Sequence, residues 1–236
     1  GEAIQSVLAQ SYSSWELLVV NDGSTDTTAE VVRSFQDPRI RLINKENGGE
    51  SSARNVALDH SRGEFIAYLD ADDAYLPHHL AVTVDYLGGN PHRDAVYTDG
   101  SHIDESGNRL ASLQSRRRGP FEGRLFEHAV LASDIFGPPV CVVLRHDIVA
   151  RHRLRYDPRI VIGPDWEFFT RCTDFAEFGF LPDCTCLYRV HQTNITARVD
   201  PARRTESLAI CREKAIKTES FKICSAETRV AVFYDL

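Results

Sequence analysis

Three carboxylates come directly after a short apolar segment in the first third of the chain. Residues 64–69 read Glu-Phe-Ile-Ala-Tyr-Leu, and Asp70, Asp72 and Asp73 follow. The apolar run predicts a central strand, and α/β sheets bind ligands beyond the carboxyl ends of such strands. If the chain stays extended, Asp70 and Asp72 point to the same side. Their oxygens suit Mg²⁺ or Mn²⁺, which usually complete their coordination with substrate phosphates. The alternative is a solvated acidic turn.

The segments around these carboxylates alternate between helix-like and strand-like patterns. Helices are expected over residues 2–10, 27–35, 51–62 and 77–88, and strands over residues 15–20, 39–43 and 64–69. This alternation predicts an α/β domain with a mostly parallel sheet and right-handed crossovers. The carboxyl ends of parallel strands meet at one edge of a sheet. Asp22, which follows residues 15–20, is therefore expected to face the same crevice as Asp70.

The first expected helix, over residues 2–10, has no strand before it in this sequence. A βαβ architecture places a strand there, and the 236 residues contain no Met. We therefore expect that a leading strand is missing and that the sequence is a fragment or is incomplete.

The composition argues against some classes of function. With a net charge of -7 at pH 7 and a pI of about 5.7, the chain lacks the basic character that non-specific nucleic-acid binding needs. No apolar run reaches the length of a membrane span, and no signal peptide is visible. Six irregularly spaced cysteines favour reduced thiols in a cytosolic protein over a zinc site.

Five short motifs follow one another along the chain. They are Asn21-Asp22-Gly23-Ser24-Thr25-Asp26, Asn47-Gly48-Gly49 with Ala53-Arg54-Asn55, Leu69-Asp70-Ala71-Asp72-Asp73, Asp165-Trp166-Glu167, and Tyr188-Arg189-Val190-His191 with Asn194. In this order and spacing they resemble the motifs of inverting family 2 glycosyltransferases, over about residues 2–195. The resemblance implies a Rossmann-like, three-layer α/β/α domain of the glycosyltransferase type A fold. Such a domain moves a sugar from a nucleotide donor to an acceptor hydroxyl.

The resemblance also implies a division of the chain. Residues 1–195 would form the catalytic domain, with a nucleotide-sugar-binding half over 1–98 and an acceptor-binding half over 99–195. Residues 196–236 would form a C-terminal helical extension.

The nucleotide-sugar site is expected to include the matched residues Asp22, Asn47, Gly49, Arg54, Asp70, Ala71 and Asp72. Asp22 would accept a hydrogen bond from a ring N–H, which favours uracil or thymine and hence a UDP-sugar. Its alternative role is to cap the helix after Gly23. Arg54, in the first turn after a glycine-rich loop, would reach the base or the diphosphate. Its alternative is an exposed helix charge.

The implied cofactor is Mn²⁺ or Mg²⁺. Asp72 is expected to coordinate it directly, while Asp70 contacts ribose or metal. His191 would complete the metal shell or touch the diphosphate, with a plain hydrogen-bonded histidine as the alternative. The metal would act as a Lewis acid on the leaving diphosphate.

Asp165 is the candidate general base, which takes the proton of the acceptor hydroxyl as that oxygen attacks the anomeric carbon. The family usually has Glu-Asp where this chain has Pro164-Asp165, so the base remains while acceptor positioning is altered. The alternative for Asp165 is a helix N-cap carboxylate.

The resemblance implies that the acceptor is a saccharide or a lipid-linked molecule. It also implies a cytoplasmic enzyme, either free or at the membrane surface, that makes a surface polysaccharide. Arg116, Arg117 and Arg118 lie in an expected loop over residues 114–124. They would grip a phosphorylated or membrane-bound acceptor, or they are solvated charges.

Two other functions remain open on the sequence. A phosphatase of the haloacid dehalogenase type also has Asp-x-Asp after a strand, but near the start of its domain, so it fits this chain poorly. A non-catalytic nucleotide-sugar-binding or scaffold domain is the second, because the resemblance implies that the missing leading strand lines the base and ribose pocket. The residues fix neither the sugar, nor the acceptor, nor the oligomeric state.

Overall fold

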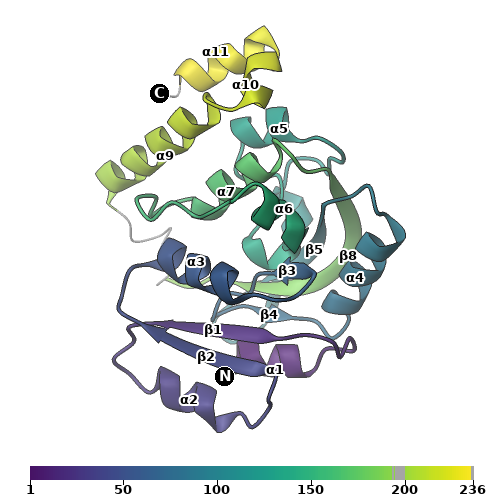
Figure 1. The fold of residues 1–236 in the computed structure, drawn as a ribbon, viewed down its shortest axis with the longest axis vertical. Helices are drawn as coiled ribbons and strands as arrows, with labels where there is room; N and C mark the ends of the chain where they lie inside the picture. Colours follow the sequence, from purple (N-terminus) through teal and green to yellow (C-terminus); the bar gives the residue numbers. More distant parts are fainter. Residues whose placement is uncertain (193, 195–199, 235–236) are drawn as a thin grey trace.

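Two β-sheets form the framework of the chain in the computed structural model, which describes residues 1–192, 194 and 200–234. The smaller sheet pairs β1 (Leu17–Asp22) with β2 (Ile40–Lys45) in parallel. The helices of this region are α1 (Glu2–Leu8), α2 (Thr28–Ser34) and α3 (Glu50–His60). The helices and strands expected in this region are thus confirmed, with ends that differ by a few residues (Figure 1).

Among the described residues, the larger sheet has six strands, in the order β3-β7-β5-β8-β4 with β6 paired to β5. They are β3 (Phe65–Ala67), β4 (Ala74–Tyr75), β5 (Ala95–Ile103), β6 (Arg109–Ser112), β7 (Val142–Arg145) and β8 (Phe178–Arg189). β5 and β8 run parallel, whereas the other neighbours in this sheet run antiparallel.

The sheet is therefore mixed, and the expectation of a mostly parallel sheet holds only for the β1–β2 and β5–β8 pairs. The difference arises because β7 lies between β3 and β5 and runs against both. The alternation of the first 90 residues predicts parallel crossovers, but β7 comes from the irregular second half of the chain. Its position in the sheet is fixed by tertiary packing.

The remaining helices lie around the larger sheet. They are α4 (His79–Gly89), α5 (Phe126–Leu131), α6 (His146–Arg151), α7 (Pro164–Cys172), α9 (Pro201–Ala215), α10 (Glu219–Ile223) and α11 (Ala226–Tyr234), with short 3₁₀ turns at Leu113–Arg116 and Pro139–Cys141. Figure 1 places α9, α10 and α11 at the end of the molecule farthest from β1 and β2. The described part of the predicted C-terminal extension is thus helical, and it packs on α5 and α7.

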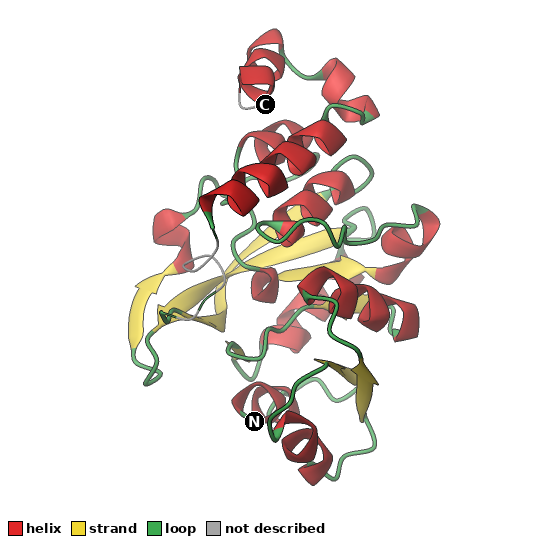
Figure 2. Cartoon of the chain, turned by 90° about the vertical axis from the view of Figure 1, so that its left-hand side faces the viewer, coloured by secondary structure: helices red, strands yellow, loops and turns green. Residues whose placement is uncertain are grey.

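β5 forms the centre of the core, because helices cover both of its faces. Tyr97 packs in one apolar cluster with Phe168 and Phe169 of α7. Val96, on the opposite face, packs with Leu87 of α4. Successive strand residues point to opposite faces, so this strand has helices on both sides, as the three-layer arrangement requires (Figure 2).

A cavity of about 720 Å³ separates the two sheets. Leu17 and Leu18 of β1 line one side of it, and Phe65 and Ile66 of β3 line another. β1 and β3 share no ladder of hydrogen bonds in the described structure. α1 packs on β4 of the larger sheet, and α3 packs on β1 of the smaller sheet.

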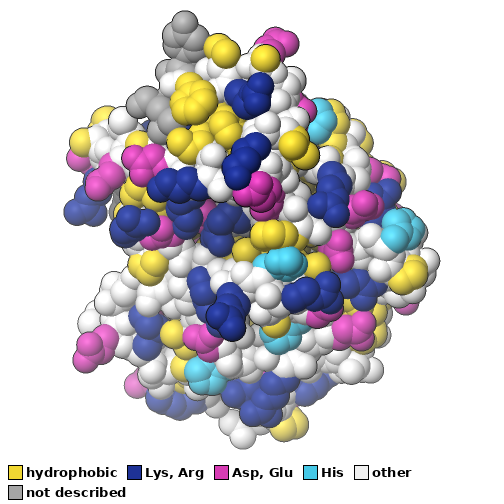
Figure 3. Space-filling view, turned by 45° about the horizontal axis from the view of Figure 1, so that its top comes forward, with side chains coloured by type: hydrophobic (Ala, Val, Ile, Leu, Met, Phe, Trp, Pro, Cys, Tyr) yellow, Lys and Arg dark blue, Asp and Glu magenta, His cyan; other side chains and the backbone are white. Residues whose placement is uncertain are grey.

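All six cysteines are free thiols, as the irregular spacing predicts. Cys141 Sγ and Cys186 Sγ lie 3.4 Å apart without a disulfide bond. Within the described chain, every helix is too short or too polar to cross a bilayer. On the face that Figure 3 presents, acidic and basic side chains are interspersed.

Candidate active site

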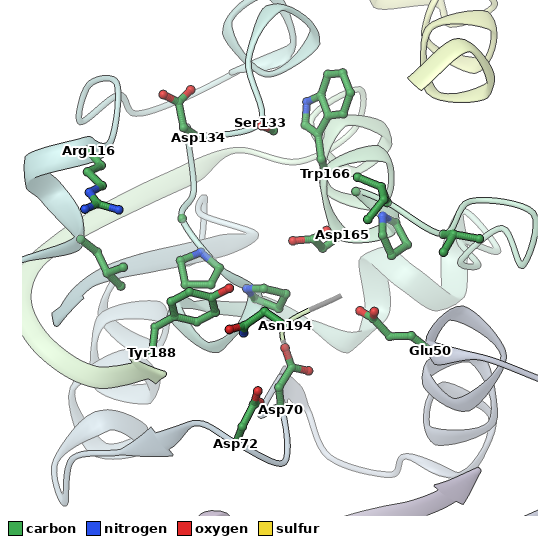
Figure 4. A pocket seen from close by; sticks show the side chains of 18 of the residues that line it. Glu50, Asp70, Asp72, Arg116, Ser133, Asp134, Asp165, Trp166, Tyr188 and Asn194 are labelled. Carbon is green, nitrogen blue, oxygen red and sulfur yellow. The ribbon is translucent and has the colours of Figure 1, made fainter. Parts of the chain in front are cut away.

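A cavity of about 680 Å³ lies between the carboxyl end of β3, the N-terminal turns of α3 and α7, and the end of β8. We refer to it as the central cavity (Figure 4). Its acidic, basic and histidine lining residues are Glu50, Arg54, Asp70, Asp72, His102, Arg116, Arg117, Asp134, Asp165, His191 and Arg204. Five of the residues expected from the sequence thus meet in one space, although they come from segments far apart in the chain.

Arg54 is the cation among the carboxylates of this cavity. Its Nη2 donates to Asp70 Oδ1 at 2.9 Å, and its Nη1 forms a 2.8 Å ion pair with Glu50 Oε1. The guanidinium lies over the ring of Tyr156, 5.3 Å from the ring centre. The side chain is 11% exposed, so the alternative of an exposed helix charge is wrong.

The charges around Arg54 perturb one another. Burial opposes its positive charge, but the carboxylate of Asp70, assisted by Glu50 and Asp165, raises the pKa of Arg54 well above its ordinary value. Desolvation, against the opposing charge of Arg54, raises the pKa of Glu50 to about 7. Arg54 therefore stays charged and holds the acidic side of the central cavity together.

Side-chain to backbone hydrogen bonds on either side of Arg54 in the sequence hold the first turns of α3 in place. Asn55 exchanges two hydrogen bonds with the backbone of Tyr156, at 2.9 Å and 2.8 Å. Asp22 accepts hydrogen bonds from the N–H groups of Gly48 and Gly49, at 3.0 Å and 2.7 Å, just before α3 begins. Asp22 thus holds the loop that starts α3.

Asp22 does not cap the helix after Gly23, so that alternative is wrong: α2 begins at Thr28, with Thr27 as its N-cap residue. The carboxylate instead accepts a hydrogen bond from Lys45 Nζ at 2.5 Å. Burial acts against the charge, but the hydrogen bonds from Lys45 and the glycine N–H groups hold the pKa of Asp22 below its usual value.

Four expected site residues lie outside the described lining of the central cavity, namely Asp22, Asn47, Gly49 and Ala71. Asp22 is therefore not among the residues that line the central cavity with Asp70. The turn around Asn47 is instead packed against Gly23, which has φ +75°. A Cβ at Gly23 would lie 2.8 Å from the backbone nitrogen of Asn47.

Asp72 and His191 meet across the end of the larger sheet. Asp72 Oδ2 lies 2.8 Å from His191 Nε2, and Asn194 Oδ1 accepts the backbone N–H of His191 at 2.6 Å. The chain turns after Asp70. Asp70 contacts Arg54 and Asp72 contacts His191, yet both carboxylates line the same cavity (Figure 4).

Arg189 fixes the loop that carries Asp72. Its backbone N–H donates to Asp73 Oδ1 at 2.8 Å, and its Nε donates to the carbonyl oxygen of Asp72 at 2.8 Å. Its Nη2 donates to Glu2 at 2.6 Å, and this ion pair joins the end of β8 to the start of α1. Burial raises the pKa of Asp73 to about 8, with Arg189 acting against it and the charges of Asp70 and Asp72 adding to it.

Asp72 and His191 together could supply two metal ligands. The described residues contain no group of three or more His, Cys, Asp or Glu side chains placed to hold a metal ion. A divalent cation here would need further oxygens, and the phosphates of a nucleotide are the usual source. The pair therefore fits a metal that is bound together with its substrate, and it does not fit a permanent structural ion.

Asp165 lies in the first turn of α7, with its side chain lining the central cavity. Gly163 is the N-cap residue of this helix and Pro164 the first helical residue, so the alternative of an N-cap role for Asp165 is wrong. Burial raises the pKa of Asp165, with Arg54 acting against it and Asp70 adding to it. A carboxylate with a raised pKa is a stronger base.

Glu50 is a site residue that the sequence analysis missed. It lies one turn before Arg54 and directly after Gly49, which has φ +82°. Figure 4 shows its carboxylate pointing into the central cavity, as those of Asp70 and Asp165 do. The available signal was the four-residue spacing to Arg54, which is that of a helical ion pair.

The family model described as Glycosyl transferase family 2 matches residues 1–190. The UDP-Glc:alpha-D-GlcNAc-diphosphoundecaprenol beta-1,3-glucosyltransferase WfgD of Escherichia coli is 43% identical over 86 residues, which are 36% of this chain and 34% of that protein. The chain spans between 12% and 23% of the length of four further curated relatives.

Two solved structures share the fold. TarS 1-349 of S. aureus in complex with UDP-GlcNAc has a TM-score of 0.78 at 18% identity, covering 98% of this chain and 66% of that chain. The mannosyltransferase PcManGT of Pyrobaculum calidifontis, in complex with GDP-Man and Mn2+, has a TM-score of 0.66 at 20% identity, covering 99% and 64%. This likeness confirms the expected α/β fold of glycosyltransferase type A.

Proposed function

The chain belongs to glycosyl transferase family 2, and on that premise we propose that it transfers a sugar from a nucleotide-diphosphate donor to an acceptor hydroxyl, with inversion. The observation that carries this proposal is the convergence of Arg54, Asp70, Asp72, Asp165 and His191 on one cavity. These residues supply a cation, carboxylate and imidazole ligands, and a base in one space, which are the groups that such a transfer needs.

The donor is proposed to be a UDP-sugar. Asp22 would accept the ring N–H of uracil, and TarS, with which the chain shares its fold, has been solved with UDP-GlcNAc. Asn47, Gly49 and Ala71 belong to the same proposed nucleotide site. Arg54, whose positive charge is stabilised by neighbouring carboxylates, would bind the diphosphate.

Asp72 and His191 would hold a Mn²⁺ or Mg²⁺ together with the donor diphosphate. Bound there, the metal would supply Lewis-acid stabilisation of the leaving diphosphate. The mannosyltransferase from Pyrobaculum calidifontis has been solved with Mn2+ and its donor, which supports this class of cofactor. Asp70 would contact the ribose or the metal in addition to Arg54.

Asp165 would act as the general base. Its carboxylate takes the proton of the acceptor hydroxyl while that oxygen forms a bond to the anomeric carbon. The bond between the anomeric carbon and the diphosphate breaks at the same time, and its electron pair leaves with the diphosphate. A single displacement of this kind inverts the configuration at the anomeric carbon.

The acceptor is proposed to be a saccharide carried on a lipid diphosphate, in surface polysaccharide synthesis. WfgD is named for such an acceptor, and it is 43% identical over its matched segment. The reaction is proposed to take place in the cytoplasm, free or at the membrane surface. The free thiols of this chain suit a reducing compartment.

The test is to incubate the protein with Mn²⁺ and a panel of UDP- and GDP-sugars, and to measure release of the nucleoside diphosphate. We expect release from a UDP-sugar, with loss in Asp72→Asn and Asp165→Asn. Asp85→Asn, on an exposed part of α4, is the matched control and should keep full activity. Proton NMR of the product should show inverted anomeric configuration.

Other outcomes of this experiment would contradict the proposal. Activity on simple phosphomonoesters alone would indicate a phosphatase. Donor binding without turnover would indicate a non-catalytic nucleotide-sugar-binding domain.

A further inference from the structure

Arg117 carries a buried guanidinium that a single acceptor atom contacts within the described residues. The residue is 9% exposed. Its Nη1 donates to the carbonyl oxygen of Thr98 at 3.0 Å. In the part of the chain that the structure describes, Nε and Nη2 have no hydrogen-bond partner. No carboxylate of the described residues lies within ion-pair distance of it.

Buried cations in proteins are normally paired, because desolvation of an uncompensated charge is unfavourable. Arg54 follows this rule, with Asp70 and Glu50 as its partners. Arg117 has only the ring faces of Tyr97 and Phe180, at 5.2 Å and 5.9 Å, which compensate part of the charge. An anion would compensate the rest of the positive charge of this guanidinium.

The two unpartnered nitrogens of Arg117 lie on one edge of the guanidinium group. Nε–H and one Nη2–H point in the same direction, and this two-donor fork matches two oxygens of a phosphate or carboxylate. Arg117 lines the central cavity beside Gly137. A Cβ at Gly137 would collide with Nη2 of Arg117. The guanidinium can therefore lie there only because residue 137 has no side chain.

The central cavity has two electrostatic sides. Glu50, Asp70 and Asp165 belong to the acidic side, and Figure 4 shows Arg116 across the cavity from Glu50. The side with Arg116 and Arg117 also contains His102, whose Nδ1 is buried without a partner among the described residues. The proposed donor and metal site lies on the acidic side, so an anion on the other side would belong to the acceptor.

Asp134 is the acidic lining residue nearest in sequence to Gly137 on this part of the cavity. Its carboxylate pairs with Arg118 at 3.5 Å, and the side chains of Arg118 and Asp134 are 65% and 40% exposed. It therefore does not neutralise the buried charge of Arg117.

From this placement we propose that Arg117, together with Arg116 and His102, binds a phosphoryl group of the acceptor. The inference rests on the proposed glycosyl transfer and names its acceptor class, a phosphorylated saccharide. Two adjacent arginines suit the charge of a phosphoryl group better than that of a single carboxylate. The shared chemistry fits a sugar phosphate in solution and a sugar on a lipid diphosphate.

The first experiment needs no turnover. Calorimetric titration of the protein with N-acetylglucosamine 1-phosphate, without donor or metal, should show binding that Arg117→Gln weakens about tenfold to hundredfold, as expected for charge-assisted hydrogen bonds. Arg118→Gln, which removes a neighbouring exposed charge, is the matched control and should bind as the unchanged protein does. Arg117→Lys keeps the charge without the fork and should recover only part of the affinity.

The second experiment compares acceptors in the transfer reaction. We expect a higher kcat/KM for an alkyl diphosphate-linked sugar than for the alkyl glycoside of the same sugar, and Arg117→Gln should remove this preference through KM. N-acetylglucosamine 1-phosphate as acceptor separates the phosphoryl group from the lipid. A uronic-acid glycoside in place of the phosphate tests a carboxylate.

Several results would overturn the inference. Equal loss on phosphorylated and unphosphorylated acceptors would indicate a structural role for Arg117. An increased KM for the donor would place the donor diphosphate there instead. Preference for the uronic-acid glycoside would identify a carboxylate ligand. Phosphate binding in the titration without any donor turnover would support this site while contradicting the proposed function.

Discussion

The Arg54→Gln substitution gives the most detailed prediction from the structure. Arg54 is 11% exposed and pairs with Asp70 and Glu50, which are 38% and 36% exposed. Breaking a fully buried ion pair costs about 3–5 kcal/mol, and an exposed pair contributes about 0–1 kcal/mol. Because the carboxylates are partly solvated, we expect an intermediate loss in the free energy of unfolding, about 2 kcal/mol.

This loss should depend on pH. Arg54 lowers the pKa values of Glu50 and Asp165, so both rise further when its charge is removed. The folded variant then binds more protons than the unfolded chain between their unfolded and folded pKa values, and its stability falls as the pH rises through that range. The loss should therefore be larger at pH 8 than at pH 5.

The assay is thermal unfolding at pH 5 and pH 8. A loss of about 2 kcal/mol corresponds to a Tm decrease of about 4–8 °C for a domain of this size. Arg151→Gln is the matched control, because Arg151 pairs with Asp147 on the surface, with exposures of 64% and 62%. If the Tm of Arg54→Gln decreases no more than that of Arg151→Gln, the ion pairs of Arg54 do not stabilise the fold. If the decrease is the same at pH 5 and pH 8, Arg54 does not control the pKa values of Glu50 and Asp165.

Three further predictions follow from individual contacts. The Tm of the Asp73→Asn variant, measured relative to the Tm of the unchanged protein, should rise as the pH increases from 4 to 8. The raised pKa of about 8 means that ionisation of the buried carboxyl destabilises the folded state in that range; a constant Tm difference would contradict this. Asp165→Asn should reduce kcat by about 10²–10⁴ while the KM for the donor changes little, as expected for a lost general base, and unchanged kcat would exclude that role. Gly23→Ala should lower Tm, because φ is +75° and the new Cβ would lie 2.8 Å from the backbone nitrogen of Asn47, whereas Gly88→Ala, with open space around it, should not.

Site residues that belong to a local sequence pattern could be predicted from the sequence. The position of Asp70 and Asp72 after a strand could be predicted, because an apolar run that ends in carboxylates has a local signature. The meeting of Asp72 with His191 was expected only through the resemblance, since no local pattern joins residues so far apart. The structure places these two side chains 2.8 Å apart.

Other features depend on long-range packing and had no local signal. Asp22 and Lys45 are register partners in the β1–β2 pair, and this register brings the ammonium group to the carboxylate. The antiparallel insertion of β7 between β3 and β5 likewise follows from packing. The burial of Arg117 depends on contacts with Thr98 and Tyr97, so its loop reads as solvated in the sequence.

Asp72 and His191 are proposed to bind a divalent cation together with the diphosphate of a nucleotide donor. Anomalous diffraction at the manganese edge, from crystals containing UDP and Mn²⁺, tests this proposal most directly. We expect one strong peak within coordinating distance of Asp72 Oδ2 and His191 Nε2, and no such peak in Asp72→Asn. If manganese binds elsewhere, or if UDP and Mn²⁺ bind without contact to Asp72, the metal site proposed at Asp72 and His191 is wrong.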